Sequence, residues 1–202
     1  MRERVEPFRA MAIGQLAREL EAEGRSVIHM EFGQPSTGAP AAALAAVREA
    51  LDRDPPGYWE SMPLRQRIAR LYRERHGIDI DPARILLTCG ASPALLLALL
   101  TRFEAGDRIA YATPGYVAYR NTTIAAHMQP VAIACGPEVG YQLTADAIAA
   151  LEPAPVGLII ASPANPTGTI IDAIALRAIA ETCRQRGIAI ISDEIYHGLD
   201  YG

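Results

Sequence analysis

Five short apolar runs alternate with helical stretches from residue 85 onward, and this alternation constrains the fold more than any other feature of the chain. The runs are ILLT (85–88), RIAYA (108–112), QPVAI (129–133), VGLIIA (156–161) and GIAIIS (187–192). Helical patterns lie near 91–102, 115–126, 144–151 and 172–186. Strands that are apolar on both faces and separated by helices favour a parallel sheet covered by helices on each side. The sequence therefore predicts an α/β fold.

The residues before the first apolar run are mostly helical in pattern. An amphipathic arm helix is predicted from Phe8 to Glu23, closed by Gly24. The segment SVIHMEF (26–32) then alternates apolar and polar residues. Further helices are predicted over 41–51 and 64–76.

Composition excludes several classes of partner. A net charge of −4 without a basic block or stripe argues against nucleic acid. The three cysteines are far apart and lack metal-ligand spacing, so we expect no metal site and a reducing compartment. No apolar leader precedes the arm helix, and the longest apolar stretch, 94–100, is too short to span a bilayer. We therefore expect a cytoplasmic protein without a membrane partner.

The loops that follow the predicted strands carry the polar residues that could form a site. In parallel α/β sheets, ligands bind beyond the carboxyl ends of the strands. Gly90, Ala91 and Ser92 open a helix there, which suits a phosphate; Ser92 as the N-cap ahead of Pro93 explains the same residues equally well. Tyr116 follows the next strand in a TPGY turn, where packing is the more frequent role of a single tyrosine.

Two later loops hold a fixed amide and a carboxylate. Pro163 and Pro166 stiffen the SPANPTG loop around Asn165, although an ordinary turn would have the same sequence. Asp193 is the first residue beyond the last apolar run, where a desolvated carboxylate needs a cation or hydrogen-bond donors. An N-cap role for Asp193 is the alternative, with about even odds on local grounds.

Taken together, these loops resemble one protein family. GAS, TPGY, NPTG and SDEIY follow EFGQPSTGAP and GYWESMPLRQRIA with the order and spacing of a pyridoxal-phosphate aminotransferase of class I/II and fold type I. The resemblance runs from about Val5 to Gly202 and covers only the N-terminal half of such an enzyme. NPTG followed by DEIY after one helix and one strand is its most specific part.

The resemblance implies roles for individual residues around pyridoxal 5′-phosphate. The phosphate cradle would be made by Gly90, Ala91 and Ser92. The ring that stacks on the pyridine would be Tyr116, and the groups that hydrogen-bond the phenolic oxygen would be Asn165 and Tyr196. Asp193 would pair with the protonated ring nitrogen.

Other implications of the resemblance concern partners and organisation. Tyr58 resembles the tyrosine that reaches the phosphate of a neighbouring subunit, so a homodimer is expected of the full-length form, and Gly33 resembles the backbone that meets the substrate carboxylate. The substrates would be an amino acid and a 2-oxo acid. The N-terminal arm and the start of a small domain would occupy 1–35, and a partial cofactor-binding large domain would occupy 36–202.

The chain has no lysine, because all 19 basic residues are arginine. The family needs a lysine that bonds to the cofactor and then moves protons. We therefore expect no catalytic residue in this chain, little activity of the chain alone, and a sequence truncated as a gene fragment, a split gene or a shortened chain. In the family's strand order two later strands separate 85–88 from 187–192, so we expect 85–88 to be displaced or paired with another chain. A carbon–sulfur lyase of the same fold, or a non-catalytic α/β fragment, remains the alternative.

Overall fold

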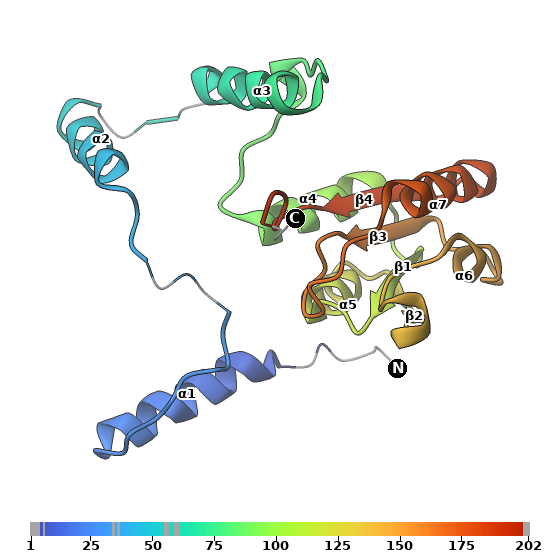
Figure 1. Ribbon diagram of the computed structural model, residues 1–202, viewed down its shortest axis with the longest axis horizontal. Helices are drawn as coiled ribbons and strands as arrows, with labels where there is room; N and C mark the ends of the chain where they lie inside the picture. The colour runs from blue at the N-terminus through green and yellow to red at the C-terminus, as the bar shows by residue number, and fades with distance from the viewer. Residues whose placement is uncertain are drawn as a thin grey trace. The chain divides into compact units, whose positions relative to one another are not determined.

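Two compact units divide the chain in the computed structural model, which describes residues 5, 7–33, 35, 37–54, 57–58 and 61–199 (Figure 1). One unit is Phe8–Leu87, and the other is Thr88–Gly202 together with Met1–Pro7. The predicted domain boundary at residue 35 stays a prediction. No helix in the described ranges combines the length and the apolar character that crossing a bilayer demands.

The Phe8–Leu87 unit contains the three predicted helices. They are α1 (Arg9–Ala22), α2 (Ala41–Arg53) and α3 (Met62–His76), and a 3-10 turn η1 (Pro82–Arg84) follows them. The α3 helix begins where the Ser61 hydroxyl accepts a hydrogen bond from the Leu64 N–H at 3.3 Å. It ends at Gly77, whose φ of +67° is the left-handed conformation that glycine adopts without strain.

The segment after α1 folds back along that helix. A Cβ atom placed on Gly14 would lie 2.6 Å from the Phe32 ring, so only glycine lets the ring approach the helix this closely. His29 lies between two carboxylates, 2.7 Å from Glu31 and 3.1 Å from Glu21, and the hydrogen bond to Glu31, then the one to Glu21, raises the pKa of His29. The alternating segment 26–32 forms no strand in the structure, because contacts with α1 replace a sheet partner.

The Thr88–Gly202 unit contains a parallel sheet, which confirms the predicted α/β fold. Its strands are β1 (Arg108–Thr113), β2 (Gln129–Ala134), β3 (Gly157–Ala161) and β4 (Ala189–Asp193), in the order β2-β1-β3-β4. All three pairings are parallel. The chain runs from β1 to β2 on one side and then crosses to β3 on the other. This reversal opens a crevice at the carboxyl ends of β1 and β3.

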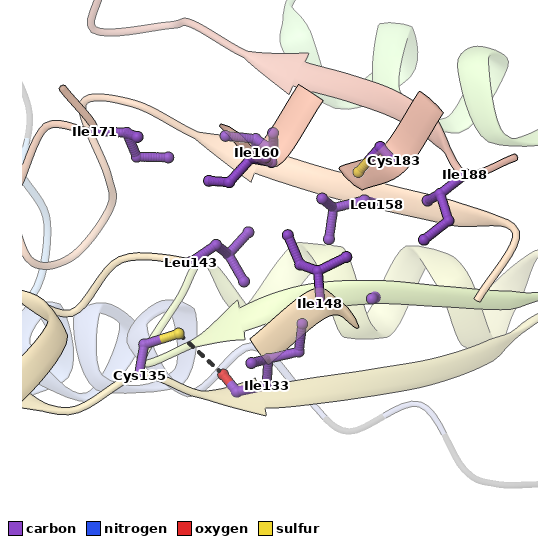
Figure 2. Packing of buried hydrophobic residues seen from close by; sticks show 11 residues of the cluster. Ile133, Cys135, Leu143, Ile148, Leu158, Ile160, Ile171, Cys183 and Ile188 are labelled. Carbon is purple, nitrogen blue, oxygen red and sulfur yellow. Dashed lines mark hydrogen bonds between the residues drawn. The ribbon is translucent and has the colours of Figure 1, made fainter. Parts of the chain in front are cut away.

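Helices cover both faces of this sheet. One face packs on α4 (Ala91–Arg102) and α5 (Val117–Ala125), with Ile109 and Ile159 buried there. The other face packs on α6 (Ala145–Ala149) and α7 (Ala173–Arg186). In Figure 2, Leu143 and Ile148 face the β3 residues Leu158 and Ile160 across this second layer. Neighbouring residues of β3 therefore point to opposite layers, as an internal strand requires.

The predicted strand at 85–88 is wrong for this chain. These residues are described and form no strand, and the side chains of Leu86 and Leu87 are 60% and 37% exposed. The outer edge of β4 has no strand partner among the described residues. An apolar run without a sheet neighbour has nowhere to form its ladder hydrogen bonds, so the absence of the strand agrees with the expectation that 85–88 is displaced.

We expect the chain alone to be of low stability and prone to aggregation. The open β4 edge and exposed apolar residues such as Leu86 favour association with other chains. In hydrogen exchange, the amides at 85–88 should exchange far faster than that of Ile159, which is 1% exposed in the central sheet. A monomeric chain that melts cooperatively with strongly protected amides at 85–88 would contradict this.

Candidate functional site

A cavity of about 190 Å³ lies at the carboxyl ends of the strands in the Thr88–Gly202 unit. Its walls come from the start of α4, the turn after β1, the loop after β3 and the residues that follow β4. The lining residues are Ala91, Ser92, Leu95, Tyr116, Tyr119, Ala161, Pro163, Asn165, Asp193, Ile195 and Tyr196. The fold therefore brings together, around one cavity, predicted site residues from four separate loops.

Asp193 is the last residue of β4 and presents its carboxylate to this cavity. One carboxylate oxygen accepts a hydrogen bond from the Tyr119 hydroxyl at 2.7 Å. The other accepts one from the Ile195 N–H at 3.2 Å. The alternative of a helix N-cap is wrong, because a short turn follows Asp193 instead of a helix, and its second donor comes from α5.

Tyr119 is a site residue that sequence reasoning missed. It is only 4% exposed, and burial followed by the hydrogen bond to Asp193 raises the pKa of its phenol. The hydroxyl therefore stays protonated and acts as a donor to the carboxylate. Tyr119 also meets Tyr116 edge to face, with ring centroids 5.6 Å apart. The available sequence signal was its position three residues after Tyr116, one helical turn along the same face.

The start of α4 forms another wall of the cavity. Gly90 is the N-cap with a φ of +98°, and the helix has no side-chain cap hydrogen bond. Ser92 as the N-cap is therefore wrong, because α4 begins at Ala91 and Ser92 lies inside its first turn. Ala91 and Ser92 both line the cavity. The first N–H groups of a helix and its positive dipole end suit an anion.

The loop after β3 carries Asn165 into the cavity wall. Its ends are held by a hydrogen bond from the Ile171 N–H to the Ser162 hydroxyl at 3.0 Å, and it closes through Gly168 N–H to Ala164 O at 2.8 Å. The Asn165 amide lies 3.5 Å from the Tyr196 hydroxyl. The predicted pair of donors thus lies on one side of the cavity, from two different loops.

Gly33 and Tyr58 belong to the Phe8–Leu87 unit. Tyr58 is fully exposed there, and nothing lies within 4 Å of a Cβ atom placed on Gly33. Their predicted roles in substrate and phosphate binding stay predictions.

Replacing Tyr119 with phenylalanine should weaken the fold and change its response to alkali. At neutral pH the change removes a buried donor to Asp193, and we expect a loss of about 1.5 kcal/mol in the free energy of unfolding. The pKa of Tyr119 in the folded chain lies above its ordinary value of 10.0, so the unfolded chain releases this proton first and stability falls as the pH rises above 10.0. Tyr119→Phe should make that alkaline decline shallower.

Urea unfolding at neutral and alkaline pH measures both effects. Tyr141→Phe is the matched control, because Tyr141 is 38% exposed and lies outside the cavity. A Tyr119→Phe chain with the neutral stability and alkaline slope of the unmodified chain would show that the hydrogen bond to Asp193 has no energetic weight.

Comparisons with known proteins point in one direction. Residues 25–202 match the family described as aminotransferase class I and II. The chain is 42% identical over its whole length to valine–pyruvate aminotransferase of Mycobacterium tuberculosis, of which it covers 53%. It is 32% identical to aspartate aminotransferase of Geobacillus stearothermophilus, covering 97% of this chain and 51% of that protein.

Solved structures agree with the sequence relatives. A crystal structure of an aminotransferase from Mycobacterium tuberculosis superposes with a TM-score of 0.95 at 42% identity, covering 100% of this chain and 53% of the other. The aspartate aminotransferase of Thermus thermophilus with maleate gives 0.92 at 26% identity, covering 98% and 53%. The chain thus spans about half the length of the proteins that it matches.

Proposed function

Because this chain belongs to the class I and II aminotransferase family, we propose that it supplies the cofactor-binding half of a pyridoxal-phosphate-dependent transaminase. The proposed reaction transfers an amino group between an amino acid and a 2-oxo acid. We further propose that the full-length form is a cytoplasmic homodimer, in which the exposed Tyr58 contributes to the neighbouring subunit's phosphate site.

The donor set of the cavity fits this cofactor. A protonated pyridine nitrogen needs a fixed anion, and Asp193 supplies one that Tyr119 holds at 2.7 Å. This buried pair at the cavity is the single observation that carries the proposal. The amide of Asn165 and the hydroxyl of Tyr196 could hydrogen-bond a phenolic oxygen, and the uncapped start of α4 could receive a phosphate.

The residues of this chain have binding and orienting roles in the proposed reaction. When bound, pyridoxal phosphate supplies an electron sink for reactions at the α-carbon of an amino acid. Asp193 would keep the proton on the ring nitrogen, which maintains that sink. Tyr116 would cover one face of the ring and exclude water from it. Asn165 and Tyr196 would fix the rotation of the ring in its plane, leaving proton transfer to a lysine outside this chain.

A chimeric enzyme tests the proposal directly. Residues 1–202 would replace the matching half of the Mycobacterium tuberculosis valine–pyruvate aminotransferase, to which the chain is 42% identical. Transfer of an amino group to pyruvate, measured with a panel of donors that includes valine and aspartate, is the expected result. A folded chimera that binds no pyridoxal phosphate would contradict the proposal. Release of a thiol from a cysteine conjugate without transamination would instead identify a carbon–sulfur lyase.

A further inference from the structure

A buried glutamine connects the turn after β2 to the loop that carries Asn165. Gln142 is 8% exposed, and its amide nitrogen donates to the Thr169 carbonyl at 2.7 Å and to the Thr169 hydroxyl at 3.0 Å. The two residues are 27 positions apart in sequence and belong to the exits of β2 and β3. These two strands are not neighbours, because β1 lies between them. The amide therefore spans the exit of the strand that precedes Tyr116.

The acceptor of this amide is the residue that closes the Asn165 loop. The Thr169 carbonyl also accepts a hydrogen bond from the Ala164 N–H at 2.9 Å, and the Thr169 hydroxyl lies 2.9 Å from the Thr167 hydroxyl. Asn165 lies within the stretch that these contacts enclose. A shift of Thr169 would consequently move the backbone on both sides of Asn165.

The backbone before Gln142 is built to direct its side chain inward. Gly140 and Tyr141 both have positive φ values, +59° and +58°, and turn the chain sharply after the 3-10 turn η2 (Pro137–Val139). Tyr141 N–H donates to the Gly136 carbonyl at 2.9 Å, and Leu143, next to Gln142, is 2% exposed in the core (Figure 2). A left-handed conformation at a non-glycine residue is unfavourable, so the surrounding contacts must hold it.

The turn that carries Gln142 is itself anchored to the central strand. Cys135 N–H donates to the Thr113 carbonyl at 2.8 Å, which joins the exits of β2 and β1. The amide thus transmits the position of a rigid, buried turn to an otherwise surface loop.

From these contacts we propose that Gln142 is a positioning residue for the cavity: its amide holds the 162–171 loop in the conformation that presents Asn165 to Tyr196. Gln142 does not line the cavity itself and acts through Thr169. The inference deepens the proposed function, because Asn165 is one of the groups assigned there to the cofactor.

The first experiment measures the loop itself and needs no cofactor. In Gln142→Met, which keeps the size of the side chain and removes the donor, the amides of Ala164, Gly168 and Ile171 should exchange with solvent about tenfold faster. The amide of Ile159 in β3 should be unchanged. Gln185→Met is the matched control, because Gln185 is an exposed glutamine whose amide donates to Glu181 on the same helix. Unchanged exchange at the three loop amides would overturn the proposal.

Gln142→Glu separates a donor role from simple filling of space. At about pH 8 its carboxylate would face the Thr169 carbonyl and repel it, whereas at about pH 5 a protonated carboxyl group could donate again. Loop protection, corrected for intrinsic exchange rates, should therefore rise as the pH falls in this variant alone. Equal protection at both pH values would contradict the donor role.

The second experiment connects the loop to the cavity. Titration of the chain with pyridoxal 5′-phosphate should give a dissociation constant about fivefold higher for Gln142→Met than for the unmodified chain or Gln185→Met. Equal affinities together with faster loop exchange would show that Gln142 holds the loop without positioning Asn165. If the unmodified chain and the chimera bind no pyridoxal phosphate, the proposed function fails, while loop exchange still decides whether Gln142 holds the loop.

Discussion

Replacing Asp193 with alanine should lower the turnover of the chimeric transaminase by about a thousandfold. An ion pair at about 4 Å and an effective dielectric of about 20 is worth roughly 4 kcal/mol, which corresponds to about three units in the pKa of the ring nitrogen. Without that charge the nitrogen loses its proton near neutral pH and the electron sink is lost. Steady-state turnover with a fixed amino donor measures the effect.

Asn165→Ala provides the internal comparison for this prediction. It removes one neutral hydrogen bond, typically worth about 1 kcal/mol, so we expect a loss of about fivefold in turnover. Asp193→Asn keeps the shape of the side chain and removes its charge, so it should resemble Asp193→Ala. Equal losses in Asp193→Ala and Asn165→Ala would show that the assigned role of Asp193 is wrong.

The 202-residue chain should form no reducible side-chain adduct with pyridoxal phosphate. All of its 19 basic residues are arginine, so its only amine is at the N-terminus. After addition of pyridoxal phosphate and borohydride, peptide mapping should find label at the N-terminus or nowhere, and amino-acid turnover should be undetectable. The chimera serves as the positive control, with label on a lysine of its C-terminal half. A trapped side chain within residues 1–202 would refute this prediction.

Periodicity was sufficient to predict most of the secondary structure. The predicted helix over 91–102 is α4 (Ala91–Arg102), and four of the five apolar runs correspond to strands of the sheet. Both results depend on local patterns of apolar residues, which report which faces are buried. The run at 85–88 has the same pattern and forms no strand, because a strand also needs a neighbour, and sequence pattern alone does not supply one.

The candidate site divides in a similar way. Asp193, Asn165 and Tyr116 follow strands, and a general rule for parallel sheets places them at one edge. The contact between Tyr119 and Asp193 joins residues 74 positions apart, and the local sequence of α5 contains no sign of it. Gln142 was missed for a related reason, since its inward direction depends on two successive left-handed residues that glycine at 140 suggests only in part.

The strand that carries Asp193 is the outermost strand of the described sheet, with its far edge unpaired. A polypeptide segment that pairs with this edge would restrict the motion of the β4 backbone and hence of the carboxylate at its end. A ligand that requires the ordered carboxylate then binds the paired form more tightly, and by thermodynamic reciprocity it strengthens the pairing by the same factor. Assembly and cofactor binding are therefore coupled equilibria: the affinity for pyridoxal phosphate should increase with the degree of assembly, and added cofactor should promote assembly.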